Sequence, residues 1–208
     1  MKNTLYSLML NDEVIGEVDR LARERGVTRS GLVNEILAEY VNYTTPERII
    51  SNVLSAVDSM FSQADGLISY LSPNSRNLSL KSSIAYRFRP TIKYDISLFK
   101  GFEDTIGEMT VAYRTQSAEL ISAFEQFFRM WASFENRYCP EAEHALYDGK
   151  FVRTIPRPRS IPDAETLAAE LADYVRLFDS ELKAWLCGAH TATDVDSACR
   201  AYFAARRY

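Results

Sequence analysis

The first 43 residues contain one short strand and two helices, a set of elements too small to close a hydrophobic core alone. Residues 5–10 alternate between two faces, as expected of a half-buried strand. Helices are predicted at 11–26 and 28–41, each preceded by a polar cap, and Gly26 ends the first of them. Because so few elements bury little apolar surface, this segment must dimerise or pack on the rest of the chain.

Both faces of the predicted strand are hydrophobic, which is unusual for a strand with one face in solvent. The face expected to point inward consists of Tyr6, Leu8 and Leu10. The opposite face consists of Leu5, Ser7 and Met9. Its only polar side chain is a serine, so this face is hardly polar.

The remainder of the chain is predicted to be largely helical. A helix is expected at 46–71, a polar loop at 72–83 and an alternating strand within 85–99. Further segments are helices at about 102–113 and 115–135, a Pro-rich basic connector at 152–162, and helices near 163–186 and 193–206. The aromatic residues between Phe124 and Phe134 are expected to be core.

Charge is unevenly distributed along the chain. The net charge is −4, and an excess of acidic residues argues mildly against nucleic acid as a partner. Residues 74–100, however, hold six basic side chains against one acidic one, whereas residues 101–150 hold four basic and nine acidic ones. Three cysteines at unrelated spacings suit a reducing compartment, and no membrane span or signal peptide is recognised. We therefore expect a cytoplasmic location.

The segment "LYSLMLNDEVIGEVDRLARERGVTRSGLVNEILAEYV", residues 5–41, resembles the ribbon-helix-helix DNA-binding proteins of the Arc, MetJ and CopG kind. The resemblance lies in the short strand, the helix that ends "LARERG" and the turn "GVTRS" before the second helix, and it covers about the first fifth of the chain. It implies that two strands pair into an antiparallel ribbon in the major groove of double-stranded DNA. A bacterial, nucleoid-associated protein is then expected.

The resemblance also implies roles for particular residues. Outward side chains of the ribbon would read bases, and the N-terminus of the second helix would contact a phosphate. The implied base-reading positions are Leu5, Ser7 and Met9, and the implied phosphate contacts are Thr28, Arg29 and Ser30. Leucine and methionine have no strong hydrogen-bonding group, and residues 1–43 carry five basic and seven acidic side chains. This ribbon alone is therefore a poor reader of bases.

A second, degenerate copy of the unit is predicted at 92–130, within the region 86–135, because a shift of 88 residues superposes the apolar positions. Its outward base-reading positions would be Lys93, Asp95 and Ser97, and Arg87 and Arg89 would contact phosphates. If this copy exists, the ribbon forms within one chain as a pseudo-dimer. If it does not, two chains pair as a homodimer.

The predicted fold is therefore mainly α with a short antiparallel β-ribbon. A ribbon-helix-helix unit at 1–43 would be followed by a long helix, basic strand and helix pair at 46–150. The connector and the C-terminal helices would occupy 151–208, and these helices could bind a protein partner.

We expect a sequence-specific DNA-binding protein, either a transcriptional repressor or a plasmid accessory factor. The alternative is a protein-interaction or assembly module, or an antitoxin, that keeps the fold without specific DNA binding. No catalytic, cofactor or metal motif is recognised. The two histidines, His144 and His190, are expected to be surface or capping residues.

Overall fold

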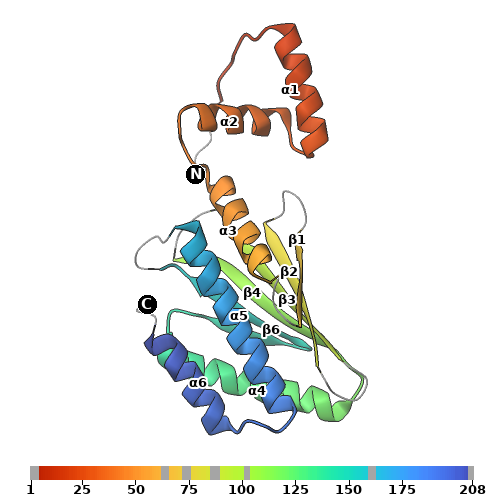
Figure 1. The fold of residues 1–208 in the computed structure, drawn as a ribbon, viewed down its shortest axis with the longest axis vertical. Coiled ribbons are helices and arrows are strands. Elements are labelled where there is room, and N and C mark those ends of the chain that lie inside the picture. Colours follow the sequence, from red (N-terminus) through yellow and green to blue (C-terminus); the bar gives the residue numbers. More distant parts are fainter. Residues whose placement is uncertain are drawn as a thin grey trace. The chain divides into compact units, whose positions relative to one another are not determined.

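The computed structural model describes residues 5–61, 66–71, 76–84, 90–100, 104–158 and 163–205, and the chain divides into two compact units (Figure 1). Unit 1 is Met1–Ile49 and unit 2 is Ile50–Tyr208. Each unit has its own secondary structure, so the two are described in turn.

Unit 1 contains two helices, α1 (Asp12–Arg25) and α2 (Arg29–Tyr40), as the sequence predicts. The Asn11 side chain caps α1 by accepting a hydrogen bond from the Glu13 backbone N–H at 2.8 Å. Gly26 ends this helix in the left-handed conformation, with φ of 64°, which a residue without a Cβ adopts freely. Residues 5–10 form no strand, because the single chain offers them no partner.

The core of unit 1 is very small. Among its described residues, the buried hydrophobic side chains are Ala22, Leu32 and Ala38. Two alanines and one leucine remove far less apolar surface from water than ordering about 40 residues requires. This agrees with the expectation that the segment cannot close a core by itself.

Unit 2 is built on a six-stranded, fully antiparallel sheet (Figure 1). The strands are β1 (Leu67–Leu71), β2 (Asn77–Ser83), β3 (Thr91–Leu98), β4 (Thr105–Arg114), β5 (His144–Tyr147) and β6 (Lys150–Pro156). Their order in the sheet is β1-β2-β3-β4-β6-β5. The first four strands form a meander, and the last hairpin joins it through β6.

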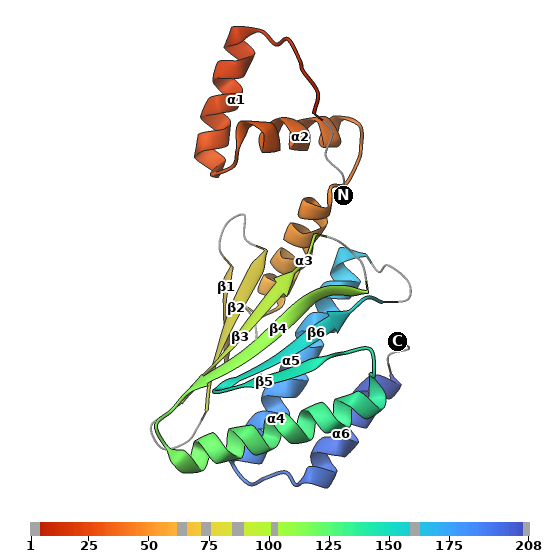
Figure 2. The same ribbon diagram turned by 180° about the vertical axis from the view of Figure 1, so that it is seen from behind.

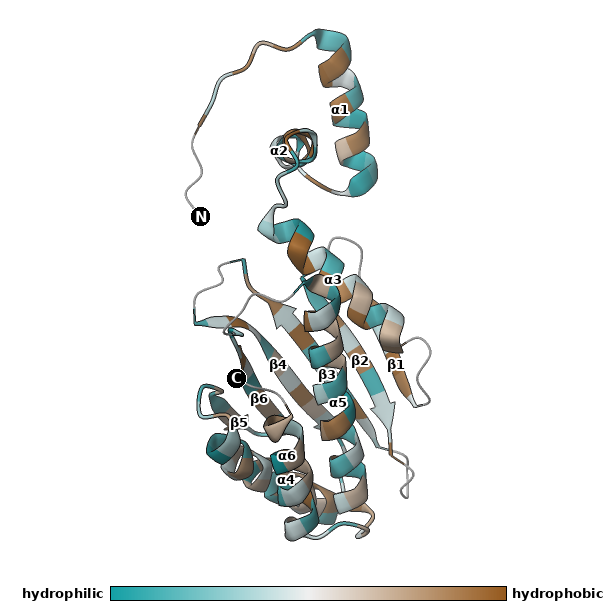
Figure 3. Cartoon of the chain, turned by 60° about the vertical axis from the view of Figure 1, so that its left-hand side comes forward, coloured by the Kyte–Doolittle hydropathy of each residue, from teal (hydrophilic) through white to brown (hydrophobic). Residues whose placement is uncertain are grey.

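Among the described elements of unit 2, helices cover one face of this sheet and none lies over the other, which we call the open face. The helices are α3 (Pro46–Phe61), α4 (Ala118–Tyr138), α5 (Ala164–Leu186) and α6 (Ala192–Ala204). Figure 2 shows the strands lying in front of α3 and α5 when the molecule is seen from behind. The strands alternate accordingly: in β3, Ile92, Tyr94 and Ile96 are buried, whereas Lys93 is exposed. Figure 3 shows the same alternation as hydrophobic and hydrophilic bands.

The core of unit 2 is centred on aromatic side chains between the sheet and the helices. The Phe178 ring of α5 lies 5.0 Å from the Trp131 ring and 5.4 Å from the rings of Phe127 and Phe151. These side chains are fully buried. The prediction that the aromatic run of α4 forms core is therefore confirmed.

The predicted fold class, mainly α with a short antiparallel β-ribbon, is wrong: the described chain contains a six-stranded antiparallel sheet together with its helices, and unit 2 is a two-layer α+β domain. The predicted helix 46–71 ends at Phe61 and is followed by β1. The predicted loop 72–83 contains β2, and the predicted connector begins inside β6. Serines in β2 and an inward-facing arginine in β6 conceal the hydrophobic alternation that would have indicated strands.

The predicted second ribbon-helix-helix copy is also not formed. Its strand lies in β3 and its second helix in α4, but its first helix, expected at 102–113, is the strand β4. Met109, Val111 and Tyr113 alternate toward the core with the period of a strand. A shift of 88 residues superposes apolar positions, but it does not distinguish the two-residue period of a strand from the longer period of a helix.

No helix in the described part of the chain combines the length and the apolar content needed to cross a lipid bilayer.

Candidate nucleic-acid interface

The predicted ribbon segment is solvent-exposed on both faces in the single chain. Leu5 is 95% exposed and Tyr6 81%, although the prediction places them on opposite faces. Leu8, Met9 and Leu10 are exposed as well. The predicted inner positions therefore do not close a core within one chain, and residues 5–10 are an uncovered, extended apolar segment without a strand partner.

The helices next to this segment carry further exposed apolar side chains. Tyr40 of α2 is 87% exposed, and Ile36 and Leu37 one turn earlier are exposed too. Val14 of α1 is exposed in the same unit. An apolar surface of this extent is unusual for a stable monomer and typical of a surface that another chain covers.

The three predicted phosphate contacts lie together at the N-terminus of α2. Thr28 caps the helix, its Oγ1 accepting a hydrogen bond from the Gly31 backbone N–H at 3.1 Å, and Arg29 and Ser30 begin the first turn. The first backbone N–H groups of a helix have no partner within it, which suits this end to an anion.

Arg29 is engaged in an ion pair inside unit 1. Its guanidinium donates two hydrogen bonds to the Asp19 carboxylate of α1, and the bond to Arg29 holds the pKa of Asp19 below its usual value. Both side chains lie at the surface. A phosphate at this helix end therefore competes with Asp19 for Arg29.

The second predicted base-reading strand lies in the interior of the sheet of unit 2. Lys93, Asp95 and Ser97 belong to β3, which pairs with β2 on one edge and β4 on the other. Since both edges are occupied, β3 cannot also form a ribbon with residues 5–10. Arg87 and Arg89 lie outside the described residues.

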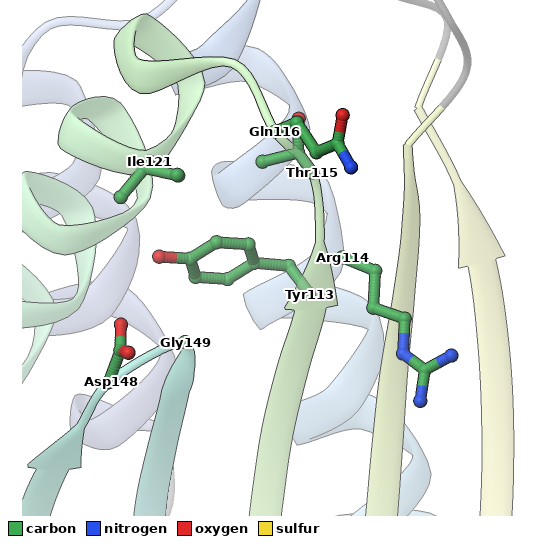
Figure 4. Close-up of a pocket in the computed structure, with 7 residues that line it drawn as sticks. All are labelled: Tyr113, Arg114, Thr115, Gln116, Ile121, Asp148 and Gly149. Carbon is green, nitrogen blue, oxygen red and sulfur yellow. The ribbon is translucent and has the colours of Figure 1, made fainter.

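A surface hollow of about 540 Å³ lies where β4 leads into α4 (Figure 4). The Tyr113 ring stacks on Phe124, with centroids 4.0 Å apart, and its buried hydroxyl has no hydrogen-bond partner among the described residues. Burial, together with the carboxylates of Glu125 and Asp148, raises the pKa of Tyr113. Because the hydroxyl is covered, a molecule in the hollow would first meet the more exposed residues lining it.

A buried polar cluster, which the sequence analysis missed, joins α4, α5, β5 and β6. Glu135 is its centre, accepting hydrogen bonds from Arg153 Nε at 2.6 Å, Tyr174 Oη at 2.7 Å and Trp131 Nε1 at 3.1 Å. Burial by itself would raise the pKa of Glu135, but Arg153 and His144 outweigh it and hold this pKa below its usual value. Each polar side chain of the cluster has a hydrogen-bond partner within it, which is typical of a cluster with a structural role.

The two histidines differ from one another in environment. His144 was expected at the surface, but its side chain is 3% exposed and its Nε2 lies 2.9 Å from a Glu135 carboxylate oxygen. His190 is partly exposed and pairs with Glu181 at 2.8 Å. In the described part of the chain, no group of three or more possible ligands is placed to hold a metal ion.

Comparisons with known proteins identify no relative: no family model, curated protein or solved structure matches this chain.

Proposed function

We propose that this protein binds double-stranded DNA through unit 1, as a homodimer in which residues 5–10 of two chains pair as an antiparallel ribbon. The observation that carries the proposal is the uncovered apolar surface of residues 5–10 and α2. A second copy covers it by supplying the missing strand and two more helices, and backbone groups that are unpaired in one chain become paired.

The order of elements in unit 1 supports DNA as the ligand. A segment with the alternation of a strand, which is unpaired in the single chain, is followed by a capped helix, a left-handed glycine and a second capped helix, in the sequence that resembles ribbon-helix-helix proteins. In the proposed complex the ribbon lies in the major groove, with Leu5, Ser7 and Met9 toward the bases. Thr28, Arg29 and Ser30 then contact phosphates on either side.

This arrangement suits a transcriptional repressor or an accessory factor that marks a plasmid site. Ser7 is the one proposed reader that can hydrogen-bond a base, while leucine and methionine can contact thymine methyl groups. We expect a modest preference for sites that present thymine methyls, with most of the affinity coming from phosphate contacts.

The proposal is tested with the full-length protein on DNA fragments selected from a random pool. Fluorescence anisotropy at about 50 mM and about 200 mM salt should show affinity that falls steeply as salt rises. The triple change Leu5→Ala, Ser7→Ala and Met9→Ala should remove the preference for the selected fragments over random ones. A control triple change on α6, Thr193→Ala, Ser197→Ala and Arg200→Ala, should leave that preference intact.

The competing function is a protein-interaction module that keeps the dimeric unit without DNA. It predicts no binding to any fragment even at the lower salt concentration, together with an intact dimer. That combination would falsify DNA binding while leaving the dimeric arrangement in place.

A further inference from the structure

The open face of the sheet in unit 2 carries a row of lysines that crosses four strands. The strand register places Lys81 of β2 directly opposite Lys93 of β3, Lys93 opposite Ala112 of β4, and Ala112 opposite Lys150 of β6. The three lysines are exposed. We call Lys81, Lys93 and Lys150 the lysine row.

A fourth basic side chain lies beside this row. Arg114, the last residue of β4, is paired in register with Thr91 and is exposed. Figure 4 shows its guanidinium on the side of β4 away from the Tyr113 ring, which places it on the open face. The basic groups therefore gather toward one end of that face.

Acidic side chains offset this charge only in part. On the strand positions of the open face they are Asp95 and Glu108, against the four basic residues. Asp95 and Lys93 form an ion pair with one another at 2.8 Å, and Asp95 also accepts a hydrogen bond from Ser79 at 2.5 Å, so within the row Lys93 has a carboxylate beside it. The open face is thus net positive in a chain whose total charge is −4.

Folding alone does not favour this arrangement. Like charges directly opposite one another on neighbouring strands destabilise a sheet, and Lys81 and Lys93 stand in that relation, with the Asp95 carboxylate offsetting part of the repulsion. A polyanion that lies across both of them would turn the repulsion into attraction. Three strand spacings separate β2 from β6, so the row extends over roughly 14 Å, enough for several phosphates of one DNA strand.

Aromatic rings flank the row at both ends. The Lys81 ammonium lies 4.9 Å from the centroid of the Tyr70 ring, and Tyr147 is exposed directly opposite Lys150. The first contact fixes the direction of a long side chain, and so reduces the entropy lost when Lys81 binds an anion.

We propose that this open face binds the phosphate backbone of double-stranded DNA through the lysine row and Arg114. The inference rests on the proposed function only for the choice of DNA as the polyanion. The open face also supplies the positive charge for phosphate contacts that unit 1 lacks. Residues 1–43 have more acidic than basic side chains, and Arg29 is paired with Asp19. Sequence preference would then come from unit 1 and salt-dependent affinity from unit 2.

The test compares three variants of the full-length protein in the same anisotropy assay. The row variant is Lys81→Gln, Lys93→Gln and Lys150→Gln, and it should lower the slope of log K against log salt by about 2 to 3, close to 0.9 for each phosphate that the protein no longer neutralises. The matched control removes three arginines from the helical layer, Arg129→Gln, Arg137→Gln and Arg200→Gln, and should keep the wild-type slope. Replacing the same three lysines by arginine should also keep it.

The outcomes separate this inference from the proposed role of unit 1. A wild-type slope in the row variant overturns the inference, as does an equal loss of slope in the arginine control. Tighter binding of single-stranded RNA than of duplex DNA also overturns it. If the ribbon triple variant is unchanged while the row variant loses its slope, the inference stands and the proposed role of unit 1 fails.

Discussion

Arg153 and Glu135 form an ion pair at 2.6 Å that is entirely enclosed between the sheet and the helices. Arg153 points inward from β6 and lies over the Tyr174 ring, 4.2 Å from its centroid. The ion pair therefore joins β6 to α4, and the contact of Arg153 with Tyr174 joins β6 to α5.

Replacing Arg153 by methionine should destabilise unit 2 strongly, by about 3–5 kcal/mol, because it leaves the Glu135 carboxylate buried without its cation. The double change Arg153→Met with Glu135→Gln should cost less than the single change, since neither charge then remains. Urea unfolding, followed by tryptophan fluorescence, measures the free energy of unfolding of the single and the double variant. A double variant less stable than the single one would contradict this account.

Stability should fall in acid because of Glu135. Its pKa in the folded protein lies below the ordinary value of 4.5, so the unfolded chain takes up a proton first as the pH falls. The contribution of Glu135 to the free energy of unfolding is complete above pH 4.5, and it is lost as the pH drops toward and through the pKa of Glu135 in the folded protein. Unfolding curves between about pH 7 and pH 3 should therefore be less pH-dependent for Glu135→Gln than for the wild type.

The mass of the protein in solution should be twice the 23.7 kDa of one chain. Changing Leu8 to aspartate should yield monomers, since it places a charge on the face expected to be buried in the dimer. The neighbouring change Ser7→Asp puts the charge on the opposite face and should leave the dimer intact. Sedimentation equilibrium distinguishes these cases, and a dimeric Leu8→Asp protein would refute ribbon pairing.

Releasing Arg29 from its partner should strengthen DNA binding. Asp19→Asn removes the carboxylate that holds the guanidinium, so the salt slope should rise by up to about 1, as expected when one more phosphate is neutralised. Glu17→Gln is the matched control: it removes one negative charge from the same helix while Arg29 stays paired with Asp19, and Arg20, the partner of Glu17, keeps its second partner Glu24. An equal gain from both changes would show that only the net charge matters.

Two glycine-to-alanine changes should have opposite effects. At Gly107, beside the irregularity in β4, an added Cβ would lie 2.3 Å from the Ser97 carbonyl oxygen, so strands β3 and β4 must separate. At Gly16, inside α1, nothing lies within 4 Å, and alanine should stabilise the helix by about 1 kcal/mol. In thermal unfolding, the transition temperature of unit 2 should fall in Gly107→Ala, and that of unit 1 should rise in Gly16→Ala.

Helices with clear caps were predictable from the sequence. The expected helix at 163–186 is observed as Ala164–Leu186, and Asp163 accepts a hydrogen bond from the Thr166 backbone N–H at 2.8 Å. Caps act within a few residues, so a sequence displays them directly.

The sheet could not be predicted in the same way, because its signals depend on distant neighbours. Arg153 faces the core only because Glu135 lies across from it, and Ser82 is buried between apolar strands. The same holds for the open face, where the lysine row is assembled by strand register from residues up to 69 positions apart. The distribution of charge along the sequence indicates the basic segment 74–100, but it does not indicate the surface that this segment forms together with Lys150 and Arg114.

The strand order of the sheet sets the order in which the domain can fold. Hairpins β1–β2, β2–β3 and β3–β4 connect neighbours in sequence, so each closes a short loop. The pairing of β4 with β6 instead brings together segments separated by the whole of α4 and β5, which makes it the slow step on entropic grounds. Amide protection during refolding should therefore develop in β2 and β3 before β6.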